Sequence, residues 1–289
     1  IRKAGEEPRS SIGALSPAMR TPSPGSLALK DWMHCKSSHE FAAFGGTGPH
    51  NSSSMSLVPR HRAMLGSAAV RQSNERGIPG DIVELGVWRG GMSCFMARTQ
   101  LRSGSANRSL WLFDTFEGMP PPSEHDHTQS RVWYRDFLNG STTFDRGCGV
   151  LDGRWCYGAL HDVQRFINST GYPSERVRYV KGKVEETLRG AQLPTQIAVL
   201  RLDTDFYSST LAELEVLWPL LSPGGWLYVD DFYDFRGCRA AVDQWLKRHS
   251  GWRGEVYKAG AFDRQTRTFH LRKSSPYDEA RPFERTSRG

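Results

Sequence analysis

The stretch Asp81-Ile-Val-Glu-Leu-Gly-Val-Trp-Arg-Gly-Gly91 decides how this chain is expected to fold. Its first five residues are a short, mostly apolar run of the kind that forms a buried strand. The glycines that follow mark a tight turn, and residues 92–102 continue as a helix. The stretch therefore predicts a strand, a glycine-rich turn and a helix in close succession.

The same alternation of strand and helix extends outward in both directions. Further strands are expected at residues 109–113, 176–180, 197–202 and 226–229, and two closing strands near 255–258 and 268–272. Helices are expected at residues 61–73 and 238–249, and one between the strands carries on one face Leu211, Leu214, Leu217, Trp218 and Leu221. Such alternation indicates a parallel sheet covered on both faces, to which the closing pair adds an antiparallel hairpin. The predicted fold class is α/β, with a doubly wound and mostly parallel sheet.

The composition of the 289 residues excludes several classes of protein. Aliphatic and aromatic residues make up 38%, and 29 glycines bring the apolar share to the level of ordinary globular proteins, so wholesale disorder is excluded. No run of about 18 apolar residues occurs, so no transmembrane helix is expected. The net charge of +7 is spread along the chain without a basic block, so neither a nucleic acid nor a membrane is expected as a partner.

One folded domain is expected between two polar segments. Residues 1–56 are rich in Ser, Pro and Gly, and most of this segment is predicted to be flexible, with a part that could form a lid. Residues 57–273 are the predicted domain, and residues 274–289 are a second flexible tail. An insertion at about residues 121–160 carries several Trp and Tyr residues, which could form either a lid over a substrate or a small satellite core.

Five cysteines occur without a C-x-x-C pair, so neither a zinc knuckle nor a dense disulfide scaffold is expected. A bridge between Cys148 and Cys156 would be compatible with export, but free thiols are the favoured prediction. Four asparagines stand in N-x-S/T sequons, which would matter only in a secretory setting. They are Asn51, Asn107, Asn139 and Asn168. The beginning of the sequence lacks a hydrophobic signal core, so a cytoplasmic location is predicted, with an organelle as the alternative.

The predicted strand ends suggest a nucleotide-like ligand, because ligands of open α/β sheets bind outside the carboxyl ends of the strands. The turn after Glu84 lacks the G-x-G-x-x-G spacing of a pyrophosphate site, while Gly86 would let the backbone approach a ligand closely. Asp114 ends the next strand, where it could accept hydrogen bonds from ribose hydroxyls. An acid beside the turn suits a cationic nucleoside such as S-adenosylmethionine. The alternative is an ordinary turn with an exposed acid.

Acidic residues also end two later strands. Asp203 follows one of them, and Asp230 and Asp231 follow the next. If these strands are neighbours, the three carboxylates converge, and their repulsion calls for a cation between them. Oxygen ligands alone favour Mg²⁺. Asp205 could add a ligand or cap the following helix, and the alternative for all of them is a set of separate, solvated loop acids.

Four ordered segments carry a family resemblance. They are residues 81–91, Phe113-Asp-Thr-Phe-Glu-Gly-Met-Pro120, Leu200-Arg-Leu-Asp-Thr-Asp-Phe-Tyr-Ser-Ser-Thr210 and Leu221-Ser-Pro-Gly-Gly-Trp-Leu-Tyr-Val-Asp-Asp231. Together they resemble the macrocin O-methyltransferase family, over about residues 60–272. The resemblance implies a class I, Rossmann-like methyltransferase fold with a seven-stranded sheet. It also implies S-adenosylmethionine and Mg²⁺ as cofactors, and methylation of a hydroxyl on a sugar or another small natural product.

The resemblance also assigns residues by position. Those that match the family's cofactor site are Glu84, Gly86 and Trp88 at the methionine end, Asp114 at the ribose, and Thr115 and Phe116 beside the adenosine. Those that match its metal site are Asp203, Asp230 and Asp231, and Asp203 is also the candidate for accepting the substrate proton. The chain departs from the family at Asp203-Thr204-Asp205, where Asp-Gly-Asp is usual, and at Lys181-Gly182-Lys183, where Pro-Gly-aromatic is usual.

The predicted function is therefore a Mg²⁺-assisted, S-adenosylmethionine-dependent O-methyltransferase for a small-molecule hydroxyl acceptor. A methyltransferase-like module that binds the cofactor without catalysis is the alternative. A nicotinamide-dependent oxidoreductase is disfavoured by the absent G-x-G-x-x-G. Self-association into a homo-oligomer is left open.

Overall fold

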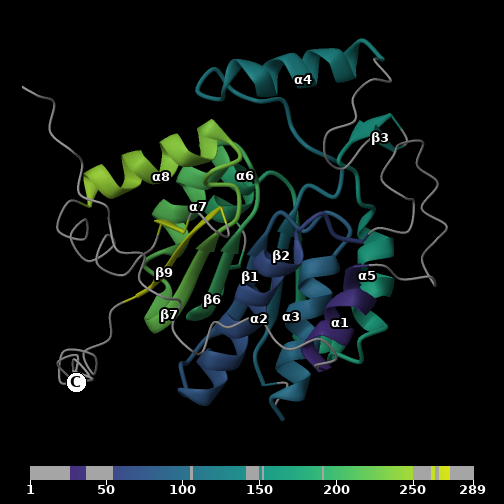
Figure 1. Ribbon diagram of the computed structural model, residues 1–289, viewed down its shortest axis with the longest axis vertical. Coiled ribbons are helices and arrows are strands. Elements are labelled where there is room, and N and C mark those ends of the chain that lie inside the picture. The colour runs from purple at the N-terminus through teal and green to yellow at the C-terminus, as the bar shows by residue number, and fades with distance from the viewer. Residues whose placement is uncertain are drawn as a thin grey trace, which may run out of the picture.

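The computed structural model describes residues 27–36, 55–104, 107–140, 150–151, 153–190, 192–249, 262–263 and 267–273. Its centre is a seven-stranded sheet in the order β5-β2-β1-β6-β7-β9-β8 (Figure 1). The first five of these strands are parallel, whereas β9 is antiparallel to β7 and β8 to β9. The predicted doubly wound sheet with an antiparallel closing hairpin is confirmed.

The strands of the main sheet are β1 (Asp81–Leu85), β2 (Leu110–Asp114), β5 (Val177–Lys181), β6 (Ile197–Leu202), β7 (Leu221–Val229), β8 (Phe262–Asp263) and β9 (Thr268–Arg272). A separate pair is formed by β3 (Val150–Leu151) and β4 (Arg154–Trp155). The α-helices are α1 (Leu27–Lys36), α2 (Arg60–Glu75), α3 (Gly91–Arg102), α4 (Thr128–Leu138), α5 (Leu160–Asn168), α6 (Val184–Gly190), α7 (Tyr207–Leu217) and α8 (Arg236–Arg248).

Helices cover both faces of the sheet because successive strand residues point to opposite sides. Ile82 packs into a core shared with helices α1, α2, α3 and α5. Its neighbour Val83 packs into a second core with α6, α7 and α8. Both strand residues are fully buried, and the helices stand on the two sides of the sheet in Figure 1. The apolar runs of the sequence thus become a three-layered domain.

Two predicted elements differ in extent or lie outside the described residues. The helix expected to reach Leu221 ends at Leu217, because Pro219 has no N–H group with which to continue it. Leu221 instead begins β7, which is longer than the predicted strand 226–229. The predicted strand at 255–258 falls outside the described residues. Of the N-terminal segment, α1 is described and docks on α3 (Figure 1).

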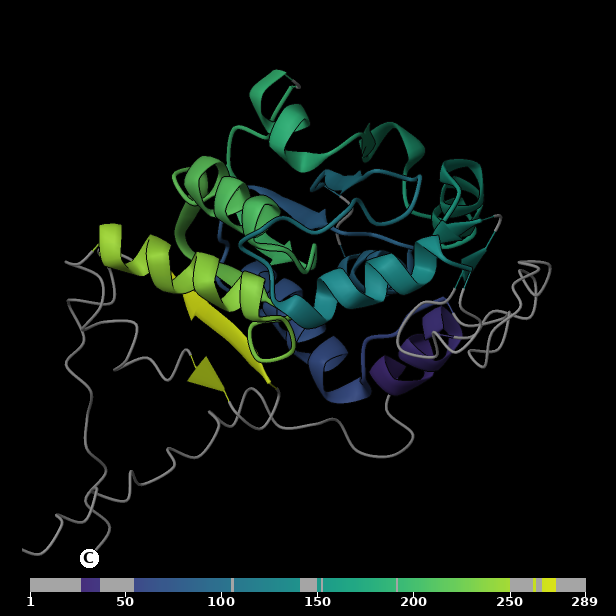
Figure 2. The same cartoon turned by 90° about the horizontal axis from the view of Figure 1, so that it is seen from above.

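The insertion after β2 carries α4, which crosses over the carboxyl edge of the sheet (Figure 2). Trp155 on β4 contacts two aromatic residues of α4, with ring centroids 6.2 Å from Tyr134 and 6.4 Å from Phe137. Trp133 of the same helix packs edge-on against Phe235, just before α8, at 6.3 Å. The insertion therefore has the small aromatic core that one alternative predicted. A lid over a substrate stays a prediction, and α4 lies over the end of the sheet where ligands are expected.

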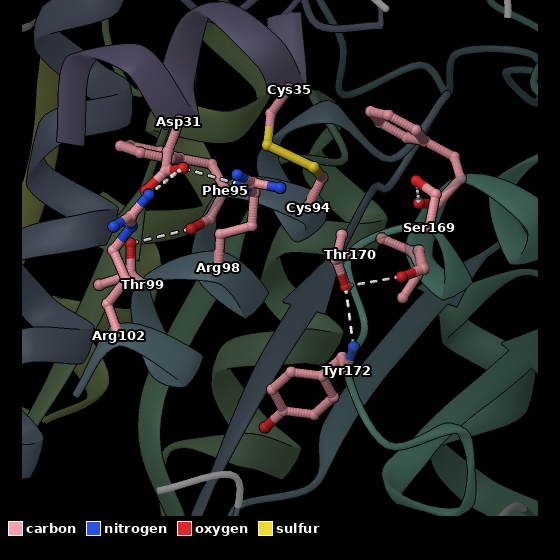
Figure 3. Close-up of a disulfide and its surroundings, with 12 residues drawn as sticks. Asp31, Cys35, Cys94, Phe95, Arg98, Thr99, Arg102, Ser169, Thr170 and Tyr172 are labelled. Atoms are coloured by element: carbon pink, nitrogen blue, oxygen red, sulfur yellow. Dashed lines mark hydrogen bonds and ion pairs between the residues drawn. A yellow bond between two sulfur atoms is a disulfide. The ribbon is translucent and has the colours of Figure 1, made fainter. Parts of the chain in front are cut away.

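A disulfide between Cys35 and Cys94 ties α1 to α3, with a Cα–Cα distance of 5.7 Å (Figure 3). Both cysteines are fully buried. Cys156 is disulfide-bonded too, to a partner outside the described residues, and Cys238 is a buried free thiol. The prediction of free thiols was therefore wrong for Cys35, Cys94 and Cys156. The spacing of cysteines in the sequence does not reveal which helices the fold brings together. None of the described helices is long and apolar enough to cross a membrane.

An ion pair reinforces the junction of α1 and α3. Asp31 is buried, accepts a hydrogen bond of 2.8 Å from Arg98 Nε and also pairs with Arg102 (Figure 3). Burial alone would raise the pKa of Asp31, but the hydrogen bonds from Arg102 and Arg98 hold it below its ordinary value. Helix α1 is thus attached to the domain by a covalent bond and by charge.

Candidate functional site

The strand order reverses between β1 and β6, since the chain steps from β1 to β2 on one side and from β6 to β7 on the other. Open α/β sheets bind their ligands at such a point. A cavity of about 280 Å³ lies here, and its walls include Glu84, Asp114 and Asp203. The insertion contributes Trp133 and Trp155 to the same cavity.

The glycine turn after β1 is held close to the end of β6. Gly86 has a φ of +83°, and a Cβ at this position would overlap the carbonyl oxygen of Asp203. Its N–H donates to the carbonyl of Phe113 at 2.9 Å, while the N–H of Asp203 donates to the carbonyl of Leu85 at 2.8 Å. Only glycine satisfies both the conformation and the space, so Gly86 sets one wall of the cavity.

Asp114 fastens this turn to the end of β2. Its Oδ2 accepts hydrogen bonds from the N–H groups of Val87 and Trp88 at 2.7 and 2.9 Å, and its Oδ1 accepts from that of Phe116 at 2.7 Å. Burial raises the pKa of the Asp114 carboxyl more than these donors lower it. Asp114 and Thr115 both line the cavity, so contact with a ribose stays a prediction for Asp114.

Phe116 does not line the main cavity, and its contact with an adenosine stays a prediction. Its side chain is 2% exposed and packs edge-on against Tyr179 at 6.5 Å. It borders a separate hollow beside Lys181 instead of the main cavity. The other predicted cofactor residues (Glu84, Gly86, Trp88, Asp114 and Thr115) do line the main cavity. A positive φ of 49° at Phe116 turns the chain inward, which the sequence did not indicate.

A row of polar residues crosses the buried sheet beside the cavity. Glu84, Arg201 and Tyr228 are register neighbours on β1, β6 and β7. Arg201 Nη1 lies 2.6 Å from Glu84 Oε1, and Nη2 lies 2.8 Å from Asp203 Oδ2 and 3.0 Å from Asp230 Oδ2. Burial by itself would lower the pKa of Arg201, but these carboxylates raise it well above its ordinary value. We call Glu84, Arg201 and Asp230 the ion-pair row.

Sequence reasoning missed Arg201. The signal was present, since residues 197–202 read as a buried strand and Arg201 is its one charged member. An arginine that is 1% exposed requires carboxylate partners, and an acid stands at the equivalent point of β1. Ser93 at the start of α3 adds a hydrogen bond to Glu84.

Asp230 is held by this row and shares Arg201 Nη2 with Asp203. Besides Arg201, it accepts a hydrogen bond of 2.8 Å from the Tyr228 hydroxyl and lies 3.7 Å from Arg62 Nη1. Tyr228 and Asp230 are two residues apart along an extended chain, so they share a face. Asp230 lines the cavity, but positive charge already surrounds its carboxylate.

Three other carboxylates stand together. Asp203, Asp205 and Asp231 each offer one oxygen, and these oxygens lie within 4.8 Å of one another. We call them the carboxylate trio. Asp231 Oδ2 is buried and has no hydrogen-bond partner among the described residues. Burial raises the pKa of Asp205 to about 7 and raises that of Asp203 and Asp231 well above their ordinary values.

The carboxylate trio fits a divalent cation, since a hard ion would satisfy the orphaned oxygen and relieve the repulsion. The neighbouring strands β6 and β7 bring Asp203 and Asp231 together, as predicted. Asp230, the third predicted ligand, lies in the ion-pair row, and Asp205 stands beside Asp203 and Asp231 instead. Binding of a metal by any of these residues stays a prediction. Asp205 reaches the group through a left-handed backbone, with φ of +68°.

The loop of the insertion that leads into α4 is anchored to helices α7 and α8. Asp126 is 4% exposed and accepts hydrogen bonds of 2.8 Å from the Ser123 N–H and hydroxyl and from the Tyr207 N–H at the start of α7. A Cβ at Gly237, in the first turn of α8, would overlap Asp126 Oδ1. These contacts hold the insertion against α7 and α8, and no motif in the sequence predicts them.

Two residues of Lys181-Gly182-Lys183 lie in the wall of the cavity, although this segment departs from the family pattern. The Gly182 N–H donates to the carbonyl of Asp114 at 3.0 Å. Gly182 has φ of +142°, and a Cβ there would crowd Thr187. Gly182 and Lys183 line the cavity together with Glu185.

The strand order and the site at the switch point define a class I methyltransferase fold. The chain belongs to the macrocin O-methyltransferase family: the family model described as Macrocin-O-methyltransferase (TylF) matches residues 30–146 and 156–253. The solved structure of the O-methyltransferase NovP aligns with a TM-score of 0.60 and 26% identity, over 78% of this chain and 84% of that one. The calicheamicin methyltransferase CalS11, at 19% identity and a TM-score of 0.53, shares the fold over 91% of this chain and 98% of its own.

Two relatives are O-methyltransferases by name. The 8-demethyl-8-(2,3-dimethoxy-alpha-L-rhamnosyl)-tetracenomycin-C 4'-O-methyltransferase of Streptomyces olivaceus is 37% identical over 193 residues, which are 66% of this chain and 67% of that protein. The mycinamicin III 3''-O-methyltransferase of Micromonospora griseorubida is 33% identical over 174 residues, 60% of this chain and 63% of that protein. The likeness thus spans about two thirds of each relative.

Proposed function

We propose that the chain is an S-adenosylmethionine-dependent, Mg²⁺-assisted O-methyltransferase that acts on a hydroxyl of a sugar or another small natural product. The carboxylate trio beside the switch-point cavity is the observation that carries this proposal. The names of the two relatives, both O-methyltransferases of natural products, support the class of acceptor.

The glycine-turn side of the cavity suits the cofactor. S-adenosylmethionine, when bound, supplies an activated methyl group on a positively charged sulfur. Asp114 places a carboxyl group in this wall, and Gly86 lets the backbone come close. Glu84 lines the same wall and is paired with Arg201. Asp114 also keeps the turn in place through its backbone hydrogen bonds, so it would preorganise the site before ligand binds.

The acidic side of the cavity suits the acceptor. Mg²⁺, when bound by the carboxylate trio, would lower the pKa of an alcohol, which a carboxylate alone is too weak a base to ionise. Asp203 and Asp205 line the cavity and are the candidates for receiving the hydroxyl proton, and Arg201 fixes the position of Asp203. Trp133, Trp155 and Phe235 would exclude water and align the acceptor, which can be worth about 7–11 kcal/mol in favourable cases.

Methyl transfer from labelled S-adenosylmethionine to a panel of glycosides and polyphenols tests the proposal. We expect Mg²⁺-dependent labelling that EDTA abolishes. Asp231→Asn should lose turnover and still bind S-adenosylhomocysteine in calorimetry, because Asp231 belongs to the carboxylate trio and not to the glycine turn. Asp243→Asn, at an exposed acid on α8, is the matched control and should keep full activity.

Three results would contradict parts of this proposal. Full activity of Asp231→Asn, or full activity in EDTA, would remove the metal from the mechanism. Binding of S-adenosylhomocysteine without transfer to any acceptor would favour the non-catalytic module instead.

A further inference from the structure

The buried disulfide is an unexpected feature for a domain predicted to lie in the cytoplasm. Reducing conditions keep cytosolic thiols free, whereas disulfides persist in oxidising compartments such as the lumen of the endoplasmic reticulum. Of the four cysteines described, Cys35, Cys94 and Cys156 are disulfide-bonded and only Cys238 is free. A thiol–disulfide oxidoreductase of such a compartment would supply the oxidant.

The use of asparagine points in the same direction. The chain contains five asparagines, and four of them stand two positions before Ser or Thr. Ser and Thr make up 44 of the 289 residues, so five asparagines would give fewer than one sequon by chance. The excess is that of a chain whose asparagines are acceptors for N-linked glycans.

The fifth asparagine provides an internal contrast. Asn74, the one outside a sequon, is tied into the interior: its amide donates to Gln100 at 2.8 Å and its carbonyl oxygen accepts from Arg108 Nε at 2.8 Å. The three described sequon asparagines are all exposed, namely Asn107, Asn139 and Asn168. The half-buried Asn74 is thus used in hydrogen bonds within the fold, whereas the three described sequon asparagines lie at the surface.

We propose that this chain passes through an oxidising secretory compartment and carries an N-linked glycan on Asn168. Asn168 is the last residue of α5 and is exposed, as is Ser169 after it. The Thr170 hydroxyl donates to the carbonyl of Ile167 at 2.6 Å and accepts from the Tyr172 N–H at 3.1 Å, which shapes a turn at the surface (Figure 3). A glycan here would extend into solvent without displacing a side chain of the core.

The sequon and the disulfide belong to one part of the fold. Phe166 and Ile167, just before Asn168, are fully buried in the same hydrophobic core as Cys35 and Cys94. Figure 3 shows Ser169 and Thr170 in the surroundings of the sulfur–sulfur bond. The glycan would lie on the surface next to this core, and the disulfide inside the core would form in the same oxidising compartment.

The modification is a group transfer that needs no oxidant. The side-chain amide nitrogen of Asn168 forms a bond to the anomeric carbon of an oligosaccharide carried on a lipid diphosphate. The bond from that carbon to the diphosphate oxygen breaks, the lipid diphosphate leaves with the electron pair, and the amide loses one proton.

The test uses the full chain, directed to the secretory lumen of a eukaryotic host by a cleavable signal and purified without reductant. Peptide-N-glycosidase F converts each glycosylated Asn to Asp, and peptide mass spectrometry then gives the occupancy. We expect a high fraction of Asp at position 168 and none at Asn74. Asn168→Gln should remove one step of the gel shift caused by the glycosidase and leave the unfolding transition unchanged. Alkylation of the denatured, unreduced protein should label Cys238 and leave Cys35, Cys94 and Cys156 unlabelled.

Unmodified Asn168 in a folded, secreted chain would overturn the proposal. So would full alkylation of Cys35 and Cys94 in that chain, since the fold would then not need an oxidising compartment. A third result would also overturn it: the wild-type chain aggregates through disulfides in the secretory lumen, but is folded and monomeric when it is made in a reducing cytosol.

Discussion

Replacement of Arg201 by Met should destabilise the protein strongly. Arg201 is 1% exposed and is paired with Glu84, Asp203 and Asp230 at 2.6–3.0 Å. Methionine fills a similar volume and removes the charge, so it leaves three carboxylates without their shared counter-ion. Removing one partner of a buried ion pair typically costs about 3–5 kcal/mol, which is a large part of the roughly 5–15 kcal/mol that stabilises most domains.

Thermal unfolding provides the measurement. For a domain of this size each kcal/mol lowers the melting temperature by about 2–4 °C, so Arg201→Met should melt roughly 10 °C lower than the wild type. Arg248→Met is the matched control, because Arg248 pairs with Glu215 at the surface, where both side chains are about half exposed. Exposed pairs contribute about 0–1 kcal/mol, so this variant should melt within a few degrees of the wild type.

A double variant separates charge from packing. In Glu84→Gln/Arg201→Met one buried carboxylate is neutralised together with the arginine, so part of the loss should be recovered. Equal melting temperatures for Arg201→Met and Arg248→Met would refute the reasoning. Failure of the double variant to regain any stability would show that Arg201 acts through its packing instead of its charge.

Three further predictions follow from particular contacts. Mg²⁺ at about 100 times its dissociation constant should stabilise the wild type by about 3 kcal/mol, which thermal unfolding would detect as a higher melting temperature. An equal rise of the melting temperature in Asp231→Asn would exclude the carboxylate trio as the binding site. Burial raises the pKa of Glu213 to about 8 from its ordinary value of 4.5, so between these pH values the folded protein binds one proton more than the unfolded chain. The free energy of unfolding should therefore fall by about 1.4 kcal/mol per pH unit as the pH rises through this range. Glu213→Gln should flatten this slope in urea titrations at pH 5–8, and an unchanged slope would contradict the prediction. The Cys35–Cys94 bridge closes a sequence separation of 59 residues, so Cys35→Ser/Cys94→Ser should cost about 4 kcal/mol in urea unfolding, and a loss below about 1 kcal/mol would argue against the bridge.

The sheet and the position of the site could be predicted because they follow from local pattern. Apolar runs of five or six residues fix the strands β1 and β6, and glycines fix the turn between β1 and α3. A rule about strand ends then places Glu84, Asp114 and Asp203 at one edge. None of these steps needs to know which side chain contacts which.

The parts that could not be predicted depend on side-chain direction and on tertiary contacts. Asp230 and Asp231 are neighbours in sequence, and nothing in their identity shows that the first turns to Arg201 and the second to the cavity. Phe116 occupies a motif position, yet a positive φ sends its ring into the core. The Cys35–Cys94 bridge depends on the docking of α1, which no periodicity near Cys35 indicates.

The acids at the switch point divide into two sets with different counter-ions. Glu84 and Asp230 lie in the ion-pair row, where Arg201 is a permanent part of the fold, and Asp203 is bonded to the same arginine. The remaining members of the carboxylate trio have no arginine within ion-pair distance in the described part of the chain. The acids of the ion-pair row are therefore neutralised by an arginine of the protein itself. The acids of the carboxylate trio stand at the cavity, where an exchangeable ion could neutralise them. It follows that removal of Mg²⁺ should abolish activity in a protein that stays folded, whereas loss of Arg201 should lower both activity and stability.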